Sequence, residues 1–421
     1  MNIATTGSQA PILVQKYGGS SVADVAKIKR VAELIRARRA EGYRICVVVS
    51  AMGKTTDGLL HQAQELAQEP PRRELDMLLS CGERASMALL AMALDAQGVP
   101  SISFTGSQSG ILTNDRHSDA RILEVRPYRV QDELDADKVV IVAGFQGVSY
   151  RREITTLGRG GSDTTAVALA AALGADCEIY SDVDGVYSAD PRIVANARRL
   201  ESLSHEEMQE LAAAGARVLH AQAVQFAKAK NIAIFCKKTG GGPEGSVVRR
   251  DAPRPQGGVR GIAHKPRFLS LAADDFQRAE ALLAHLAAHE IRCGQLFGQA
   301  ALPVLGDISD KATAALCVLV PPDDAHGVEA CLANLPAGIV RTEDVGAVSL
   351  VGQGLLEDQQ VLTQTLRYLR EAEIAVLGVS TSSFRMTVLV EPDSVERACR
   401  ALHAAFIEVR QAQPLLADAV T

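Results

Sequence analysis

The chain has 421 residues, of which 47% are apolar, so it is long enough to bury a large core and to form two to four domains. Its net charge of −6, scattered basic residues and lack of tryptophan argue against a nucleic-acid binder. The first ten residues lack the features of a signal peptide, and the most apolar run, 166–175, is too short to cross a bilayer. We therefore expect a cytoplasmic protein that does not bind a membrane.

The first 240 residues predict strands that alternate with helices. The predicted strands are 12–17, 44–50, 101–104, 138–145, 177–183 and 232–236. The predicted helices are 22–42, 56–68, 74–96, 164–173, 204–213 and 217–229. This alternation, with continuous apolar strands such as RICVVVS, indicates an α/β domain with a mostly parallel sheet. Gly/Pro-rich segments between 240 and 262 predict a domain boundary.

The remaining residues predict a repeat of two small α+β modules, each with the order β-α-β-β-α. We expect domains at 1–250, 262–342 and 345–421, the last two regulated by a small ligand. His285 and His289 are one helical turn apart in the first module. His285 is followed by Leu286 and not by a glutamate, so the pair does not form an HExxH motif, and we expect an ordinary helix face and no metal site. The eight cysteines form no CxxC pair and predict buried, reduced thiols.

Two glycine loops carry the chemical signals. Residues 157–166 read LGRGGSDTTA, where glycines, a cation and a Ser-Asp helix start could surround an anion with N–H groups. Residues 15–21 read QKYGGSS, with Lys16 at the end of a strand. No GxxxxGK[ST] motif is present, and the GxGxxG letters at 240–245 contain Pro243 and precede no helix. A tight strand-to-helix turn without a ligand is the alternative interpretation of each loop.

Seven segments in order resemble the aspartate kinases. They are VQKYGGSSVAD, SAMGKTTDGLL, CGERAS, FTGSQSGILTNDRHSDARI, VAGFQG, TTLGRGGSDTTAVALAAALGA and YSDVDGVYSADPR. The resemblance implies an amino-acid-kinase-like three-layer sandwich with a mostly parallel central sheet, followed by two ferredoxin-like ACT regulatory modules. It implies transfer of the ATP γ-phosphoryl group to the β-carboxylate of L-aspartate, giving 4-phospho-L-aspartate, the first intermediate toward lysine, threonine and methionine. A carboxylate nucleophile has a pKa near ~4 and needs no general base.

The resemblance also implies the residues of the site. Lys16 and Asp163 would be catalytic. The substrate-binding residues would be Ser50, Thr56, Glu83, Arg159, Gly160, Gly161 and Ser162. The ATP-binding residues would be Lys16, Gly18, Gly19, Ser20, Ser181, Asp182, Tyr187, Asp190, Arg192 and Arg217. Glu83 would bind the amino group of aspartate and Arg159 a carboxylate. Mg²⁺ would be held mainly by the phosphates.

The sequence departs from the family pattern in several places. Arg217 stands where a lysine is common, and the Pro-Gly turn before the helix is missing in both modules, with Asp358-Gln359 replacing it in the second. We therefore expect altered feedback inhibition by lysine and threonine. We also expect a homodimer or larger assembly. The alternatives are a kinase of another amino-acid carboxylate in a specialised pathway and an inactive ACT-based amino-acid sensor.

Overall fold

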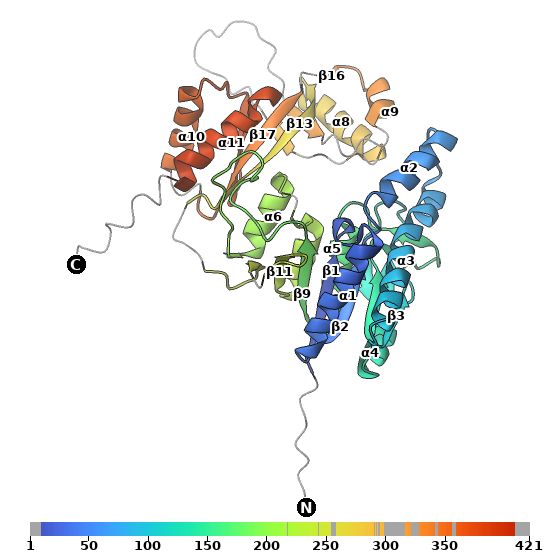
Figure 1. The fold of residues 1–421 in the computed structure, drawn as a ribbon. Coiled ribbons are helices and arrows are strands. Elements are labelled where there is room, and N and C mark those ends of the chain that lie inside the picture. Colours follow the sequence, from blue (N-terminus) through green and yellow to red (C-terminus); the bar gives the residue numbers. More distant parts are fainter. Residues whose placement is uncertain are drawn as a thin grey trace, which may run out of the picture. The chain divides into compact units, whose positions relative to one another are not determined.

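The computed structural model describes residues 10–216, 218–242, 244–253, 258–289, 291, 293, 295–298, 316–320, 328–341, 344–355 and 359–408. The chain forms two units, whose elements are labelled in Figure 1. Unit 1 holds the residues up to Val186 together with Arg199–Ala213 and Arg217–Arg254. Unit 2 holds Tyr187–Arg198, Ala214–Ala216 and the chain from Pro255 onward.

An eight-stranded sheet lies at the centre of unit 1, in the order β10-β12-β11-β9-β1-β2-β6-β3. Its strands are β1 (Ile12–Tyr17), β2 (Arg44–Val49), β3 (Ser101–Phe104), β6 (Val139–Ala143), β9 (Asp176–Ser181), β10 (Ser202–Leu203), β11 (Ile234–Lys238) and β12 (Gly245–Val248). Every neighbouring pair is parallel except β11 with β12. Because both faces are covered, the central strands are almost entirely apolar.

Helices cover both faces of this sheet. α1 (Val25–Ala40) and α3 (Arg72–Asp95) share one apolar core with Tyr17 and alternate residues of β2 and β6. The side chain of Lys16, next to Tyr17, points to the opposite face, where α5 (Gly161–Leu173) packs on β1 and β9 and against α7 (Ala221–Lys230). The other helices are α2 (Thr55–Leu66), α4 (Tyr128–Asp135) and α6 (His205–Ala214). The predicted three-layer sandwich is confirmed.

The start of α1 differs from the prediction. The sequence pattern extends the helix back to Val22, but residues Gly19–Val22 form a short 3₁₀ turn, η1. Asp24 is the N-cap, because its carboxylate accepts a hydrogen bond of 2.8 Å from the backbone N–H of Lys27. This cap sets the helix start and leaves the Gly-Gly segment as a loop.

A second, four-stranded sheet in unit 1 has the order β5-β4-β7-β8. Its strands are β4 (Ile111–Thr113), β5 (Ile122–Val125), β7 (Gln146–Ser149) and β8 (Ile154–Thr156). Strands of three or four residues leave almost no periodic signal, so the sequence pattern predicts none of these four strands. β8 leads directly into the loop before α5.

Helix α3 is, by length and apolar composition alone, long enough to cross a membrane. The core helices of soluble proteins also meet this criterion. Here α3 packs on α1, β3 and β6 and buries Leu90, Leu94 and Glu83. These contacts identify α3 as a core helix of unit 1.

Unit 2 contains a seven-stranded sheet with the path β14-β15-β13-β17-β19-β18, in which β16 also pairs with β13. Its strands are β13 (Gly261–Ala273), β14 (Gln295–Gly298), β15 (Leu316–Val320), β16 (Ile339–Arg341), β17 (Val345–Val351), β18 (Gly378–Thr381) and β19 (Arg385–Val390). Its helices are α8 (Phe276–Ala288), α9 (Val328–Ala333), α10 (Gln359–Glu371) and α11 (Val395–His403). The predicted repeat of β-α-β-β-α modules is confirmed.

Strand β13 belongs to both modules. Its first part, Gly261–Lys265, pairs with β17, and its last part, Leu269–Ala273, pairs with β15. The pairing with β17 becomes irregular between Lys265 and Phe268, where Pro266 has no N–H to donate to a ladder. The sheet of the second module therefore includes the first half of β13, which precedes the first module's helices in the sequence.

The segment Tyr187–Arg198 packs into the second module's core. Ala189 and Val194 join a cluster with residues of β17, β19 and α11. The hydroxyl of Ser188 lies 2.9 Å from Nε2 of His403, and the carbonyl of Ser188 accepts a hydrogen bond from the N–H of Ile262. A segment that interrupts unit 1 in the sequence is thus part of unit 2.

Candidate functional site

The sequence-predicted loops of unit 1 lie at one edge of its large sheet. β1 ends before Gly18, β2 before Ser50, β6 before Gly144 and β9 before Asp182. Parallel pairing places Tyr17 beside Val49 and Tyr180, so these strand ends are level. The crevice outside the carboxyl ends of parallel strands is where open α/β sheets bind ligands. The structure therefore brings the two glycine loops to one edge.

The first loop is tied to the loop after β2. The N–H of Gly53 donates to the carbonyl of Gly19, and the N–H of Ser50 donates to the carbonyl of Tyr17. A Cβ on Gly19 would lie 2.8 Å from the carbonyl oxygen of Ala51, so only glycine fits. Ser20 is exposed at the tip, and Gly18 is half-buried. Backbone hydrogen bonds thus hold the first loop against the loop after β2, while Ser20 remains exposed to solvent.

Lys16 and Asp163 form the central ion pair. Lys16 Nζ lies 2.7 Å from Asp163 Oδ1, and each side chain is only 12% exposed. At this distance the ammonium directly neutralises the buried carboxylate. Nζ also lies close to Gly18, 3.5 Å from where a Cβ would be. The ammonium thus sits between the first loop and the start of α5, where it can meet an incoming anion.

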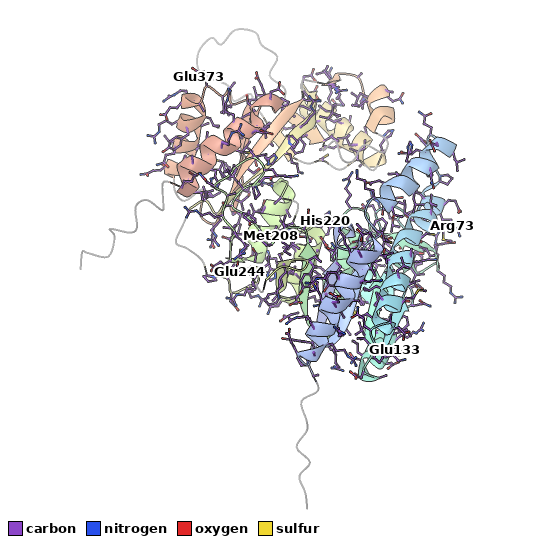
Figure 2. The ribbon with its side chains drawn as sticks, viewed as in Figure 1. Arg73, Glu133, Met208, His220, Glu244 and Glu373 are labelled. Carbon is purple, nitrogen blue, oxygen red and sulfur yellow. The ribbon has the colours of Figure 1, made fainter. Side chains whose placement is uncertain are left out.

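The second loop leads into α5 through two left-handed glycines. Gly158 has φ of 70° and Gly160 has φ of 69°, a region that other residues rarely adopt. A Cβ on Gly160 would overlap the ring of His220, which opens α7 and is labelled in Figure 2. Ser162 and Asp163 follow in the first turn and are buried. Arg159, between the glycines, is exposed.

Glu83 is the most unusual titratable group of the site. It lies on α3 and is 3% exposed, and its Oε1 accepts a hydrogen bond of 3.1 Å from the N–H of Ala51. Within the described residues its Oε2 has no hydrogen-bond partner. Burial raises the pKa of Glu83 to about 7, because the charged form loses hydration. A buried carboxylate with a vacant oxygen is suited to a cationic ligand.

The other predicted substrate residues lie around Glu83 and Ser162. Ser50 follows β2 directly and precedes Ala51, the donor to Glu83. Thr56 is the second residue of α2 and is half-buried. Gly161 begins α5, and a Cβ on Gly144 would lie 2.8 Å from the Ser162 hydroxyl. The loop after β6 thus meets the start of α5, and the loop after β2 meets Glu83 on α3.

The predicted ATP-binding residues fall into both units. Ser181 ends β9 and Asp182 is exposed just after it, in unit 1. Tyr187, Asp190 and Arg192 belong to unit 2. The Arg192 guanidinium donates hydrogen bonds to both oxygens of the Asp190 carboxylate, which lowers the pKa of Asp190. Arg217 lies outside the described residues.

Sequence reasoning missed Asp76, which organises the segment beside the second loop. Asp76 is fully buried on α3 and accepts hydrogen bonds from Thr156 (2.6 Å) and from the N–H of Ser118, while His117 Nδ1 lies 2.7 Å away. Asp119 follows Ser118 and lies beside Gly158, because a Cβ added to Gly158 would be 3.0 Å from the Asp119 carboxylate. Only the residues that Asp76 contacts in the segment NDRHSDARI carried any signal in the sequence.

Replacing Asp76 with alanine is expected to destabilise unit 1 by about 3 kcal/mol, because several buried polar groups lose their partner at once. Urea denaturation measures this loss. Asp95→Ala, at the exposed end of the same helix, should change the free energy of unfolding by less than about 0.5 kcal/mol. Equal stabilities of the two variants would show that the Asp76 contacts contribute nothing.

Glu178 is a second buried carboxylate that sequence reasoning missed. Lys237, Gln15 and Arg38 each donate a hydrogen bond of 2.7 to 2.8 Å to it. Although burial alone would raise its pKa, these donors outweigh that effect and lower it. The Tyr180 hydroxyl also donates to Glu178, and its ring stacks on that of Tyr17 at 4.8 Å. This network fixes β1 and β9 just beneath the first loop.

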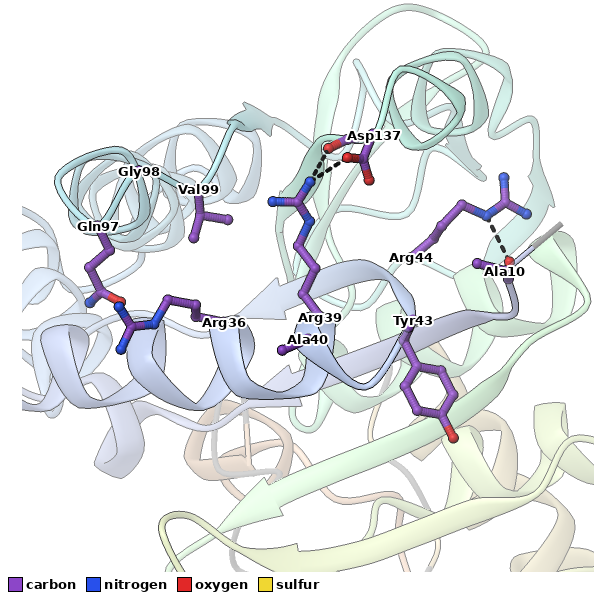
Figure 3. A pocket seen from close by; sticks show the side chains of 11 residues that line it. Ala10, Arg36, Arg39, Ala40, Tyr43, Arg44, Gln97, Gly98, Val99 and Asp137 are labelled. Carbon is purple, nitrogen blue, oxygen red and sulfur yellow. Dashed lines mark hydrogen bonds and ion pairs between the residues drawn. The ribbon is translucent and has the colours of Figure 1, made fainter.

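A pocket of about 540 Å³ lies elsewhere in unit 1 (Figure 3). It lies where α1 ends and where β2 and β6 begin, at the amino ends of the strands. Arg39 pairs with Asp137 at 2.6 Å in its wall, and Arg44 pairs with Asp135. It is therefore separate from the loops at the carboxyl ends of the strands.

Comparison with known proteins connects this geometry to a family. A model described as the amino acid kinase family matches residues 11–238, and one described as an ACT domain matches residues 348–406. An aspartokinase of Corynebacterium glutamicum is 43% identical over 94% of this chain and 96% of its own length. An aspartokinase of Thermus thermophilus is 38% identical over 94% of this chain and 98% of its own.

Solved structures show the same fold. E. coli aspartokinase III, in complex with aspartate and ADP, superposes with a TM-score of 0.77 at 23% identity, covering 93% of this chain and 99% of that one. The aspartate kinase from Synechocystis has a TM-score of 0.54 at 33% identity, covering 94% of this chain and 69% of that one.

Proposed function

Because this chain belongs to the amino acid kinase family and, within it, to the aspartokinases, we propose that it transfers the γ-phosphoryl group of ATP to the β-carboxylate of L-aspartate. The product is 4-phospho-L-aspartate, the first intermediate toward lysine, threonine and methionine. The observation that carries this proposal is the conjunction, at one sheet edge, of the Lys16–Asp163 pair and the unpaired oxygen of Glu83. The Lys16 ammonium suits a phosphoryl group, and the buried Glu83 carboxylate suits an amino group.

The chemistry requires positioning more than proton transfer. The β-carboxylate of aspartate is ionised at neutral pH and attacks without a general base. Charge accumulates on the transferred phosphoryl oxygens and must be neutralised in place. Lys16 is the residue for this role, with the backbone of Gly18, Gly19 and Ser20 close by.

The family resemblance suggests the remaining roles. Glu83 binds the α-ammonium of aspartate, and Arg159 binds a carboxylate of aspartate beside Gly160, Gly161 and Ser162. Ser50 and Thr56 complete the aspartate pocket. Residues Ser181, Asp182, Tyr187, Asp190, Arg192 and Arg217 are proposed to bind ATP.

Mg²⁺ fits this site as an ion carried by the phosphates of ATP. Asp163, the buried carboxylate beside Lys16, would help to hold it. The bound ion would neutralise phosphate charge. Lys16 would keep Asp163 oriented toward it.

Replacing Arg159 with alanine is expected to raise the KM for aspartate by about 30-fold or more and to leave the KM for ATP almost unchanged, since the lost guanidinium fork binds only the amino acid. Steady-state kinetics with each substrate varied in turn measures both. Arg151→Ala, an exposed arginine before β8, is the matched control. A larger effect on the KM for ATP would assign the second loop to the nucleotide.

The ACT modules are proposed to bind an amino-acid effector. A structure of E. coli aspartokinase III contains lysine and aspartate, which makes lysine the first candidate for this chain. Because the Pro-Gly turns are replaced in both modules, we expect lysine plus threonine to inhibit the kinase only partly at sub-millimolar concentration. Complete inhibition in that range would contradict this expectation.

We also propose a cytoplasmic homodimer or larger homo-oligomer. ATP and reduced cysteines match that compartment, and all eight cysteines are free. Sedimentation velocity of the full chain measures its molecular mass in solution, which should be at least twice that of the monomer.

A panel of amino acids tests the substrate assignment. The expected result is ATP consumption, followed as ADP release, that depends on L-aspartate and is at least about 100-fold slower with L-glutamate, because the longer chain misplaces the carboxylate. Faster release with another acid would favour a paralogous specificity. The absence of release with every acid would favour a sensor.

A further inference from the structure

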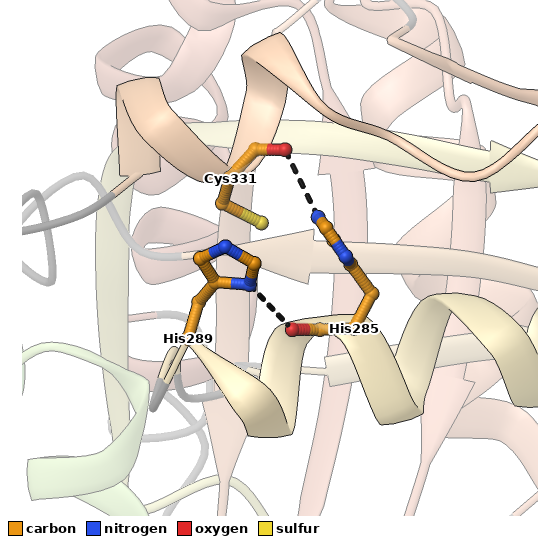
Figure 4. Close-up of side chains that lie close together, drawn as sticks. All are labelled: His285, His289 and Cys331. Carbon is orange, nitrogen blue, oxygen red and sulfur yellow. Dashed lines mark hydrogen bonds between the residues drawn. The ribbon is translucent and has the colours of Figure 1, made fainter.

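The fold brings a third metal-type ligand to the two histidines of the first ACT module. His285 lies on α8 and His289 caps its end, while Cys331 lies on α9, more than forty residues along the chain. One ligand atom from each of these residues lies within 4.8 Å of the other two. Figure 4 shows the three side chains turned toward one another. The sequence predicted an ordinary helix face because nothing in it indicates that Cys331 lies beside the two histidines.

The hydrogen bonds of the two histidines fix which ring nitrogens are available. His285 Nε2 lies 3.0 Å from the carbonyl oxygen of Cys331, and His289 Nδ1 lies 2.9 Å from the carbonyl oxygen of His285. A carbonyl oxygen only accepts, so both of these nitrogens carry the hydrogen. His285 Nδ1 and His289 Nε2 therefore keep a lone pair. Metal-binding histidines characteristically donate their other N–H to a carbonyl or carboxylate in this manner.

The remaining ligand atoms face no competing partner. Among the described residues, no hydrogen bond engages His285 Nδ1, His289 Nε2 or the sulfur of Cys331. Cys331 is fully buried, and both histidines are half-buried. Two imidazoles and a thiolate form a borderline-soft donor set that suits Zn²⁺ and not Mg²⁺. The site is thus chemically distinct from an oxygen site for Mg²⁺ at the ATP phosphates.

We propose that His285, His289 and Cys331 bind one Zn²⁺-type divalent transition-metal ion, with a water or other exogenous ligand in the fourth position. In a tetrahedral site the ligand atoms are about 3.3 to 3.8 Å apart, so the three side chains close by about 1 Å through small rotations. The metal ties the end of α8 to α9. Both helices pack on the same core, in which Leu282, Leu286 and Cys331 are buried.

Cobalt substitution tests this proposal on the full chain. After chelator treatment, Co²⁺ titration of the wild type is expected to give one equivalent of binding. The expected spectrum has a thiolate-to-cobalt band in the near-ultraviolet and intense tetrahedral bands in the visible. Zn²⁺ should displace the ion, whereas excess Mg²⁺ should not.

Variants assign the ligands. Cys331→Ser should abolish the thiolate band. His289→Gln should lower the affinity for Co²⁺ by about 10-fold or more, because even the loss of a group that only supports a ligand costs about 10-fold to 100-fold. Cys81→Ser and Cys293→Ser, which alter exposed cysteines, should leave the titration unchanged. Aspartate-dependent ADP release and circular dichroism verify that each variant is folded.

A second readout does not depend on spectroscopy. A ligand that binds only the folded state raises the unfolding temperature, so Zn²⁺ should raise that of the wild type and not that of Cys331→Ser. The proposal is overturned if the wild type binds no Co²⁺ with a thiolate band, or if the band survives Cys331→Ser. Should Cys331→Ser fail to fold, unchanged Co²⁺ affinity in His289→Gln overturns it equally.

Discussion

Replacing Lys16 with methionine is expected to lower kcat by about a thousandfold, or about 4 kcal/mol in the activation free energy. The ammonium lies 2.7 Å from Asp163 and beside the first glycine loop, where phosphoryl charge would develop. Methionine keeps the length of the side chain but removes its charge. Because Lys16 does not belong to the proposed aspartate pocket, the KM for aspartate should change less than about threefold.

Lys29→Met is the matched control. Lys29 is exposed on α1, away from the strand ends, and its replacement should leave kcat and both KM values unchanged. Initial-rate kinetics at saturating ATP and aspartate gives the comparison. If Lys16→Met instead raised the KM for aspartate and kept kcat, Lys16 would be a substrate-binding residue and not a catalytic one.

Replacing Glu83 with glutamine is expected to lower kcat/KM for aspartate by about a hundredfold, mostly through KM. Removing one partner of a buried, hydrogen-bonded charge pair costs about 2–5 kcal/mol. Glutamine keeps the shape and can still accept the hydrogen bond from Ala51, but it offers the ammonium no charge. The KM for ATP should hardly change.

The raised pKa of Glu83 gives this variant a pH signature. In the free enzyme the pKa of Glu83 is about 7, so the carboxyl is neutral below pH 7 and negative above it. The kcat/KM of the wild type for aspartate should therefore rise as pH increases to about 7 and level off above. In Glu83→Gln this rise should disappear.

The stability of the folded wild type should depend on pH in the opposite sense to its kcat/KM. A carboxyl whose pKa is higher folded than unfolded binds its proton more tightly in the native state, so it stabilises at low pH and this contribution is lost as pH rises through 7. Without substrate, Glu83→Gln should thus be at least as stable as the wild type at pH 8. Glu74→Gln, exposed on the same helix, is the control for both measurements. A variant that lost stability at pH 8 would contradict the unpaired state of Glu83.

Much of the sheet edge that carries the two glycine loops could be predicted from the sequence because its signals are local. A buried strand followed by Gly-Gly or Gly-Arg-Gly-Gly indicates a loop at a strand end, and parallel pairing then brings such loops together. Lys16 and Asp163 were each predicted to be catalytic, but their contact depends on α5 crossing the face of β1. Glu83 was predicted through family resemblance, since a lone glutamate in an apolar helix has no local signature.

What the sequence could not predict depends on contacts between distant segments. Asp76 reads as an ordinary residue of α3 until Thr156 and Ser118 fold against it. Strand β13 serves two modules, although its pattern reads as a single strand. Cys331 joins His285 only when α9 packs on the core with α8. Periodicity reports which face is buried but not what lies opposite.

The central claim is that the acceptor is the β-carboxylate of L-aspartate, and trapping the acyl phosphate tests it directly. The protein is incubated with ATP, Mg²⁺, L-aspartate and hydroxylamine, and the hydroxamate is identified by mass spectrometry and comparison with synthetic standards. We expect the β-hydroxamate of aspartate in amounts equal to the ADP released. The α-hydroxamate, or ADP release without any hydroxamate, would contradict the proposed reaction.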